Sequence, residues 1–275
     1  MLSDVPFHSG QRVAARVEYH GGHFHGWQAQ TKLSCPTVQG AVEGALGQIA
    51  CEQVATVCAG RTDTGVHGHG QIIHFEDPVG RSPKAWVMGA NRHLPDTVRL
   101  HWAVPVVDEF HARFSAQSRR YRYVVLNTPV RSSLLSGLVT WHRHDLNIAD
   151  MNQATSALLG ERDFSAFRAA GCQASTPMRC VMSCSVERMG DFVVLEIEAN
   201  AFLLHMVRNI AGSLLAVGSG ARSVDWIAEL MDARDRTLAA ETAPPDGLYL
   251  TEVCYPPMFG LPETPPGPGI LSGWL

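Results

Sequence analysis

The sequence predicts an α+β fold in which two lobes each combine β-strands with helices. Alternating apolar residues, typical of half-buried strands, recur in both halves of the chain, and each half also contains segments with helical spacing of apolar residues. The length of 275 residues is large for one hydrophobic core and sufficient for two. We therefore expect a first lobe at residues 11–113, a second lobe at 114–255 and a proline-rich tail at 256–275.

Local patterns predict the elements of the first lobe. Arg12–Tyr19 alternates apolar and polar residues, as a half-buried strand does. Thr37 is a suitable N-cap for a helix whose apolar residues recur at helical spacing up to Ile49. Ser82-Pro83 begins a second helix, which should end near His93. The other predicted strands are Val54–Cys58, Gln71–Phe75 and Val98–Ala103.

The second lobe has the same organisation. Met189-Gly190-Asp191 has the composition of a hairpin turn. The predicted strands are Arg120–Leu126, Val181–Arg188 and Phe192–Ala199. The predicted helices run from Asn147 or Asp150 to Gly160, from Leu203 to Val217, and from a Ser223 cap through Met231. Proline recurs after Tyr255, which predicts an extended or disordered tail.

Composition excludes several classes of protein. The formal net charge of -4 means that any contact with nucleic acid must use a local basic surface. The seven cysteines lack paired spacing, which indicates reduced thiols and a cytoplasmic protein. The most apolar stretch, Ala201–Val217, contains His205, Arg208 and Asn209, so we interpret it as a buried helix and not a membrane span.

The most informative segment is the loop Gly60–His67, with the sequence Gly-Arg-Thr-Asp-Thr-Gly-Val-His. The loop follows a predicted strand, and its two glycines permit close approaches of the backbone. Asp63 is thereby presented at a fixed angle, and Thr62 and Thr64 can donate hydrogen bonds that keep its carboxylate ionised. Alternatively, Asp63 is an ordinary turn aspartate that satisfies its own backbone.

This octet resembles the signature loop of the TruA family of tRNA pseudouridine synthases, Gly-Arg-Thr-Asp-x-Gly-Val-His. Six further blocks resemble segments of that family in the same order, namely Phe24–Gln28, Phe110–Arg113, Arg120–Tyr123, Gly160–Phe167, Asn200–Asn209 and Ala243–Leu250. The chain departs from the family at His20–His23, at Gly68, where alanine is usual, and at Arg120, where lysine is frequent. None of these departures involves Asp63.

The resemblance implies a role for each matched residue. Asp63 is the expected catalytic carboxylate, because an unprotonated carboxylate can attack the sugar or the base or remove a sugar proton. Arg208 lies in an apolar helix, so its charge requires a carboxylate, for which Asp63 is the candidate. Tyr121 is expected to stack on the flipped uracil, with Leu248 on the opposite wall. Arg61 is expected to occupy the place that the flipped nucleotide leaves.

Arginines also gather near the start of the second lobe. Arg113, Arg119, Arg120 and Arg122 lie close together in the sequence, with Tyr121 and Tyr123 between them. Guanidinium groups beside aromatic rings suit phosphate contacts next to base stacking, so Arg113 and Arg120 are predicted to contact the substrate. Some of these arginines are expected to pair with acidic residues across the sheet.

Further expectations concern the assembly and the substrate. The two antiparallel sheets are expected to join into a continuous mixed or antiparallel sheet flanked by helices, with the catalytic cleft between the lobes. The resemblance implies a homodimer that modifies uridines 38 to 40 in the anticodon stem-loop of tRNA, without a metal or an organic cofactor.

Three alternatives remain open at this point. The chain could form pseudouridine at other RNA positions, or it could be an RNA-binding module without catalysis. The histidines at positions 23, 25, 67, 69 and 74 could also gather around the metal of a hydrolase, although no His-Glu-x-x-His or cysteine-rich spacing accompanies them. We interpret His67 instead as a residue that braces the catalytic loop.

Overall fold

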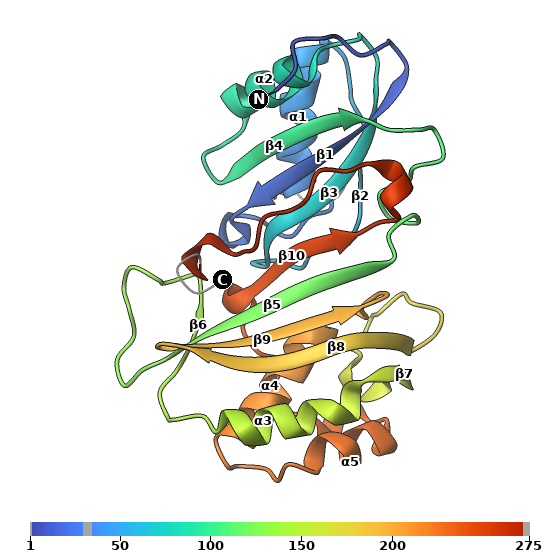
Figure 1. Cartoon of the computed structure of the whole chain (residues 1–275). Helices are drawn as coiled ribbons and strands as arrows, with labels where there is room; N and C mark the ends of the chain where they lie inside the picture. Colours follow the sequence, from blue (N-terminus) through green and yellow to red (C-terminus); the bar gives the residue numbers. More distant parts are fainter. Residues whose placement is uncertain (1, 30–34, 272–275) are drawn as a thin grey trace. The chain divides into compact units, whose positions relative to one another are not determined.

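A computed structural model describes residues 2–29 and 35–271 (Figure 1). Within these residues the chain forms ten β-strands and five α-helices, which confirms the predicted α+β class. Contacts divide the chain into two compact units. Unit 1 comprises the described residues up to Gln117 together with the C-terminal segment from Leu250, and unit 2 comprises Ser118–Tyr249. The expected joined sheet and the cleft between lobes remain predictions.

The sheet of unit 1 is built around its first strand. Strand β1 pairs antiparallel with β3 on one side and with β4 on the other, and Val13 lies opposite both Phe75 and Pro105. The strands follow the order β4-β1-β3-β10, and the short β2 pairs with β3. Their bounds are Gln11–Tyr19 for β1, Val57–Cys58 for β2, His67–Asp77 for β3, Val98–Pro105 for β4 and Leu248–Cys254 for β10.

Two helices, α1 (Val38–Ala50) and α2 (Pro83–His93), share a hydrophobic core with one face of this sheet. Both predicted caps are confirmed, because the Thr37 side chain accepts from the Gly40 amide and the Ser82 side chain accepts from the Ala85 amide. Trp86 is fully buried in this core and donates its indole N–H to the buried Asp77 carboxylate at 2.9 Å. Fully burying one large apolar side chain stabilises a fold by about 1.5–3 kcal/mol.

Irregular segments cover the other face of this sheet. His74 alternates with the core residues Ile73 and Phe75 on β3, and its ring lies against the ring of Phe110. Phe110 in turn packs against Tyr255 and Phe259 of the C-terminal segment, which crosses in front of β3 in Figure 1. The tail is largely extended, as predicted, but a hydrogen bond of 3.0 Å between the ring of His69 and the Pro265 carbonyl ties it to β3. Residues 272–275 of the predicted tail lie outside the described residues.

Unit 2 contains strands in the order β5-β9-β8-β7, with β6 parallel to β5. The predicted hairpin is confirmed, since β8 and β9 pair antiparallel from Met189 and Phe192 at the turn. The strand bounds are Ser118–Asn127 for β5, Thr140–His142 for β6, Gly160–Asp163 for β7, Met178–Met189 for β8 and Phe192–Ala199 for β9. The helices are α3 (Ile148–Thr155), α4 (Met206–Gly218) and α5 (Trp226–Ala233).

Several predicted boundaries were wrong. Strand β3 begins at His67, inside the predicted loop, and α3 ends at Thr155 and not at Gly160. Helix α5 has Asp225 and not Ser223 at its N-cap. The short strands β6 and β7 were not predicted, because neither has enough residues to show an alternating pattern, and pairing with β5 and β8 defines them.

Gly212 in α4 provides a test of this packing. A Cβ atom at Gly212 would lie 2.2 Å from the backbone oxygen of Glu241, so Gly212→Ala should force the 241–243 segment away from the helix and lower the melting temperature. A Cβ atom at Gly44 in α1 would meet nothing within 4 Å, so Gly44→Ala should raise the melting temperature, because alanine favours the helical conformation. Thermal unfolding followed by circular dichroism measures both shifts, and a melting temperature for Gly212→Ala at or above wild type would contradict this packing.

Candidate active site

Asp63 lies in the segment 59–66, which connects β2 to β3 in unit 1. Its backbone carbonyl accepts a hydrogen bond of 3.1 Å from the Val66 amide, which closes a turn. Asp63 is half-buried, whereas Arg61 and Thr64 are exposed. The turn therefore leaves part of Asp63 open to solvent.

A buried glutamine fixes the start of this segment. The side-chain amide of Gln71 donates to the Gly60 carbonyl at 2.6 Å, and its side-chain oxygen accepts from the Gly60 amide at 3.4 Å. Gln71 lies on β3 and has no exposed surface. Ala59 adds a backbone bond of 2.8 Å to Ile72 of the same strand. Hydrogen bonds from both Ala59 and Gly60 thus tie the start of the loop to β3.

The middle of the segment is held at Thr62. The Thr62 hydroxyl bonds to the Tyr19 hydroxyl at 2.8 Å, and the Thr62 carbonyl accepts from the Trp27 amide at 3.0 Å. The Thr62 hydroxyl is thus held by Tyr19, and the predicted hydrogen bond from Thr62 to the Asp63 carboxylate stays a prediction. Gly26 has a positive φ of 87°, and a Cβ atom there would lie 2.8 Å from the Thr62 oxygen, so glycine is needed for this approach.

His67 connects the end of the segment to the turn at 20–23. Its Nδ1 atom accepts a hydrogen bond of 3.1 Å from the Gly21 amide, and its ring lies edge-on to His20, with centroids 4.7 Å apart. His67 is also buried. These contacts support the interpretation of His67 as a brace for the loop.

Two positive charges lie near the base of the loop. Burial raises the pKa of the Cys58 thiol to about 11, and the nearby charges of Arg61 and Arg113 partly offset that rise. The thiol therefore stays protonated at neutral pH. Within residues 2–29 and 35–271, Arg61 forms no ion pair with an acidic side chain, so its guanidinium is available to a ligand.

Tyr121 and Leu248 belong to unit 2 and both are buried. The Tyr121 ring lies on β5 and contacts the Phe202 ring edge-on, with centroids 5.1 Å apart. Leu248 is the first residue of β10. The contact with Phe202 restrains the orientation of the Tyr121 ring.

Arg208 lies in the first turn of α4 and is half-buried. Its Nε atom donates to the Ala243 carbonyl at 2.7 Å, and its own carbonyl accepts from the Ala243 amide at 3.2 Å. Burial raises the pKa of Tyr123, and the charge of Arg208 partly offsets this rise, which places the guanidinium near that ring. The backbone at Ala243 thus holds the Arg208 side chain at its Nε atom.

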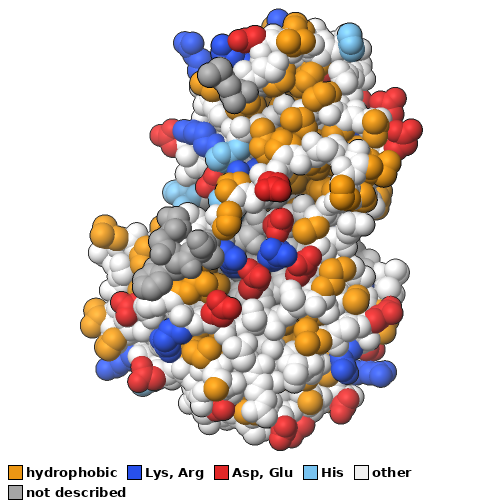
Figure 2. Space-filling model, viewed as in Figure 1, with side chains coloured by type: hydrophobic (Ala, Val, Ile, Leu, Met, Phe, Trp, Pro, Cys, Tyr) orange, Lys and Arg blue, Asp and Glu red, His pale blue; other side chains and the backbone are white. Residues whose placement is uncertain are grey.

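The arginines of β5 form ion pairs across the sheet, as was expected for some of them. Arg120 lies 2.7 Å from Glu198, Arg122 lies 2.7 Å from Glu196, and both glutamates are on β9. Since side chains alternate along a strand, Arg120 and Arg122 point away from the face that carries Tyr121. Basic and acidic side chains are correspondingly interspersed in Figure 2. The predicted substrate contact of Arg120 stays a prediction, and this geometry favours a structural role.

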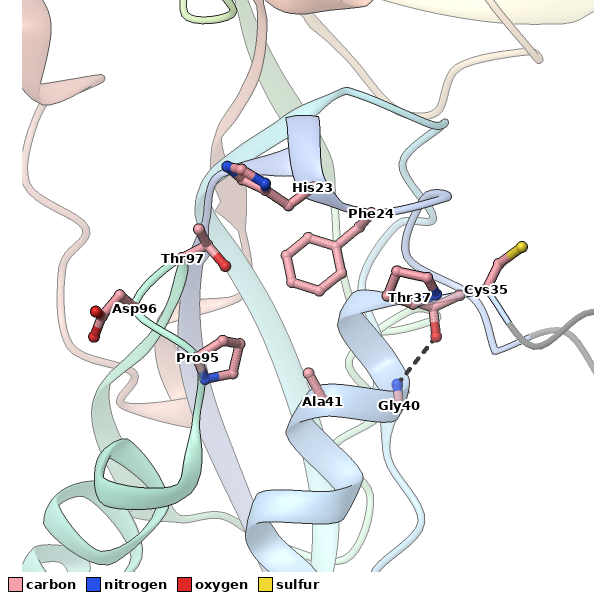
Figure 3. A pocket seen from close by; sticks show the side chains of 10 residues that line it. His23, Phe24, Cys35, Thr37, Gly40, Ala41, Pro95, Asp96 and Thr97 are labelled. Atoms are coloured by element: carbon pink, nitrogen blue, oxygen red, sulfur yellow. Dashed lines mark hydrogen bonds between the residues drawn. The ribbon is translucent and has the colours of Figure 1, made fainter.

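A separate cavity of about 570 Å³ lies beside the N-terminus of α1 in unit 1 (Figure 3). Figure 3 shows the Phe24 ring in its wall and the Thr37 hydroxyl bonded to the Gly40 amide. The other lining residues are His23, Cys35, Pro36, Ala41, Pro95, Asp96 and Thr97. None of the predicted site residues lines this cavity.

The structure also shows site residues that were not predicted. Gln71, Tyr19 and Trp27 hold the loop, although no chemistry was assigned to them. Gln71 could have been found, because it is the polar residue before the apolar pair Ile72 and Ile73 in a buried strand. Over residues 2–29 and 35–271 we find no group of three or more metal-ligating side chains that could hold an ion. In the same residues, no helix has the length and apolarity needed to cross a membrane.

Replacing Gln71 tests whether its side chain fixes the loop. Gln71→Leu leaves the Gly60 amide and carbonyl without this partner, at a cost of about 1–3 kcal/mol, so opening of the loop should become roughly tenfold more frequent. Hydrogen–deuterium exchange of a peptide that covers residues 59–66 measures this change. Gln48→Leu, at an exposed position of α1, is the matched control. Equal exchange in Gln71→Leu and wild type would show that the loop does not depend on Gln71.

Comparisons with known proteins identify relatives of this chain. A family model described as tRNA pseudouridine synthase matches residues 154–256. A tRNA pseudouridine synthase A of Tolumonas auensis is 51% identical over 94% of this chain and 98% of that protein. Proteins of the same name from Legionella pneumophila (strain Corby) and Haemophilus influenzae (strain KW20) are 53% and 49% identical, over 94% and 96% of this chain and 97% of each relative.

A solved structure of a Cbf5-Nop10-Gar1 complex also matches, with a TM-score of 0.31 and 11% identity over 86% of this chain and 57% of that chain. This score is too low to support an argument. The matches to the three relatives extend over 94–96% of this chain and so span both units. The chain therefore belongs to the tRNA pseudouridine synthase A family.

Proposed function

We propose that this protein isomerises uridine to pseudouridine in tRNA, with Asp63 as the catalytic carboxylate. The observation that carries the proposal is the fixed, half-buried position of Asp63 in a loop tied to β3 by Gln71 and to β1 by Tyr19. The membership of the chain in the family, at 51–53% identity to two named relatives, supports the same activity.

The reaction needs one carboxylate and no redox step. The bond from N1 of uracil to C1′ of the ribose breaks, the base turns, and C5 bonds to C1′. The proton on C5 is lost and N1 gains one, so substrate and product have the same composition. An ionised Asp63 can attack the sugar or the base, or remove a sugar proton.

Further residues are proposed to act on the same uridine. Tyr121, held by Phe202, supplies an aromatic face for the extruded uracil, and Leu248 supplies an apolar wall. Arg208, oriented by Ala243, supplies the positive charge that keeps Asp63 ionised. Arg61 is exposed beside Asp63 and is suited to fill the position that the extruded nucleotide vacates.

The family resemblance also suggests the target positions, the oligomeric state and the location of the protein. We propose uridines 38 to 40 of the anticodon stem-loop as targets, a homodimer as the active form and the cytoplasm as its location. The net charge of -4 and the pairing of Arg120 and Arg122 with glutamates support the dimer, because one site alone has little basic surface to hold a tRNA. Mapping of pseudouridine in tRNA from a deletion strain tests the positions.

Removal of the Asp63 charge is the main test. Asp63→Asn keeps the size of the side chain but lacks the negative charge, so we expect pseudouridine formation to fall to background while the Kd for tRNA stays within a few fold. The measurements are mass spectrometry of the product and filter binding of tRNA. Asp96→Asn is the matched control, because the Asp96 side chain is fully exposed in another loop. Loss of binding together with turnover would instead support an RNA-binding module.

Removal of the Arg208 charge should affect the rate more than the binding. Hydrogen bonds to charged groups contribute about 1.5–3 kcal/mol, so Arg208→Gln should lower kcat by roughly tenfold or more. Single-turnover kinetics measures this effect, with Arg143→Gln at an exposed position as the control. An unchanged kcat in Arg208→Gln would remove Arg208 from the proposed mechanism.

A further inference from the structure

Phe114 is an exposed aromatic residue in the segment that connects β4 to β5 in unit 1. It exposes 76% of its surface, although phenylalanine normally contributes to cores. An exposed ring of this size is available to stack against a ligand.

His111 holds the Phe114 ring and its turn in place. The His111 ring lies 4.3 Å from it between centroids, with an angle of 30° between the two planes. The Nδ1 atom of His111 accepts from the Arg113 amide at 3.1 Å and from the Phe114 amide at 3.2 Å. Ser115 bonds to both the amide and the carbonyl of His111 at 2.9 Å. Because these bonds already order the turn, binding at the ring has a small entropic cost.

The surroundings of the ring are positively charged. The guanidinium carbon of Arg113 lies 5.4 Å from the centroid of the Phe114 ring. The charges of Arg113 and Arg61 both act on the Cys58 thiol, so both arginines lie near the end of β2. This arrangement fits a flat ligand that carries negative charge beside it, as a nucleotide does.

The platform also adjoins the catalytic loop within unit 1. The His111 ring lies 4.8 Å from the His74 ring, and His74 pairs with Val57 of β2. Strand β2 leads directly into the segment that contains Asp63. Contacts within unit 1 therefore link the turn that carries Phe114 to the strand that leads to Asp63.

We infer that Phe114, backed by His111 and flanked by Arg113, is a stacking platform for an unpaired base of the RNA substrate. This inference rests on the proposed function and adds a binding residue to it. The positive charge favours RNA over a second copy of this chain as the occupant, because the adjacent Arg113 matches a phosphate group better than an apolar surface. Contact with a second copy is an outcome of the test.

The test measures the Kd for tRNA that already contains pseudouridine, so that turnover does not interfere. Stacking of one base contributes about 1–3 kcal/mol, so Phe114→Ala should raise the Kd at least about fivefold. Phe114→Leu, which stays apolar but lacks an aromatic face, should show the same loss, and Phe114→Trp should bind as wild type does. Leu134→Ala is the control, because Leu134 is 89% exposed in unit 2.

Three results would overturn the platform. An unchanged Kd for Phe114→Ala would exclude a contact with RNA, and a wild-type Kd for Phe114→Leu would exclude stacking. Dissociation of an oligomer by Phe114→Ala, seen by analytical ultracentrifugation with the Kd per protomer unchanged, would assign the ring to a contact between copies. Failure of the proposed function differs from failure of this inference, because the wild-type protein, with Phe114 intact, would then form no pseudouridine.

Discussion

The pair of hydrogen bonds between the Gln71 side chain and the Gly60 peptide is the constraint on which the candidate site depends. Gln71 is fully buried, so a loop that moved away would leave polar atoms without partners in the interior. Thr62 adds bonds to Tyr19 and to the Trp27 backbone on the other side. These contacts restrict the positions that Asp63 can take, although none of them is made by its own side chain.

The charges of the molecule serve two different purposes. On β5, Arg120 and Arg122 are neutralised by glutamates of β9, and these pairs join neighbouring strands. In unit 1, Arg61 and Arg113 lie beside the strand that leads to Asp63. A chain with a net charge of -4 can therefore still present a local positive surface to RNA.

Elements with strong local signals were predicted better than contacts between residues that lie far apart in the sequence. The caps at Thr37 and Ser82 and the β8–β9 hairpin have strong local signals, and all three are confirmed. The grouping of Arg120 with Tyr121 overlooked the alternation of strand side chains, which places them on opposite faces. Gln71 and Phe114 were missed because their roles depend on contacts with residues far away in the sequence or in a turn without a regular pattern.

The central claim is that the Asp63 carboxylate carries out the isomerisation of uridine. Release of tritium from tRNA labelled at C5 of uridine tests it most directly, because C5 loses its hydrogen when it bonds to the ribose. We expect the wild-type protein to release one tritium for each pseudouridine formed, and Asp63→Ala to release none while it keeps the circular dichroism spectrum of the wild type. Tritium release by Asp63→Ala, or none by the wild type, would contradict the account.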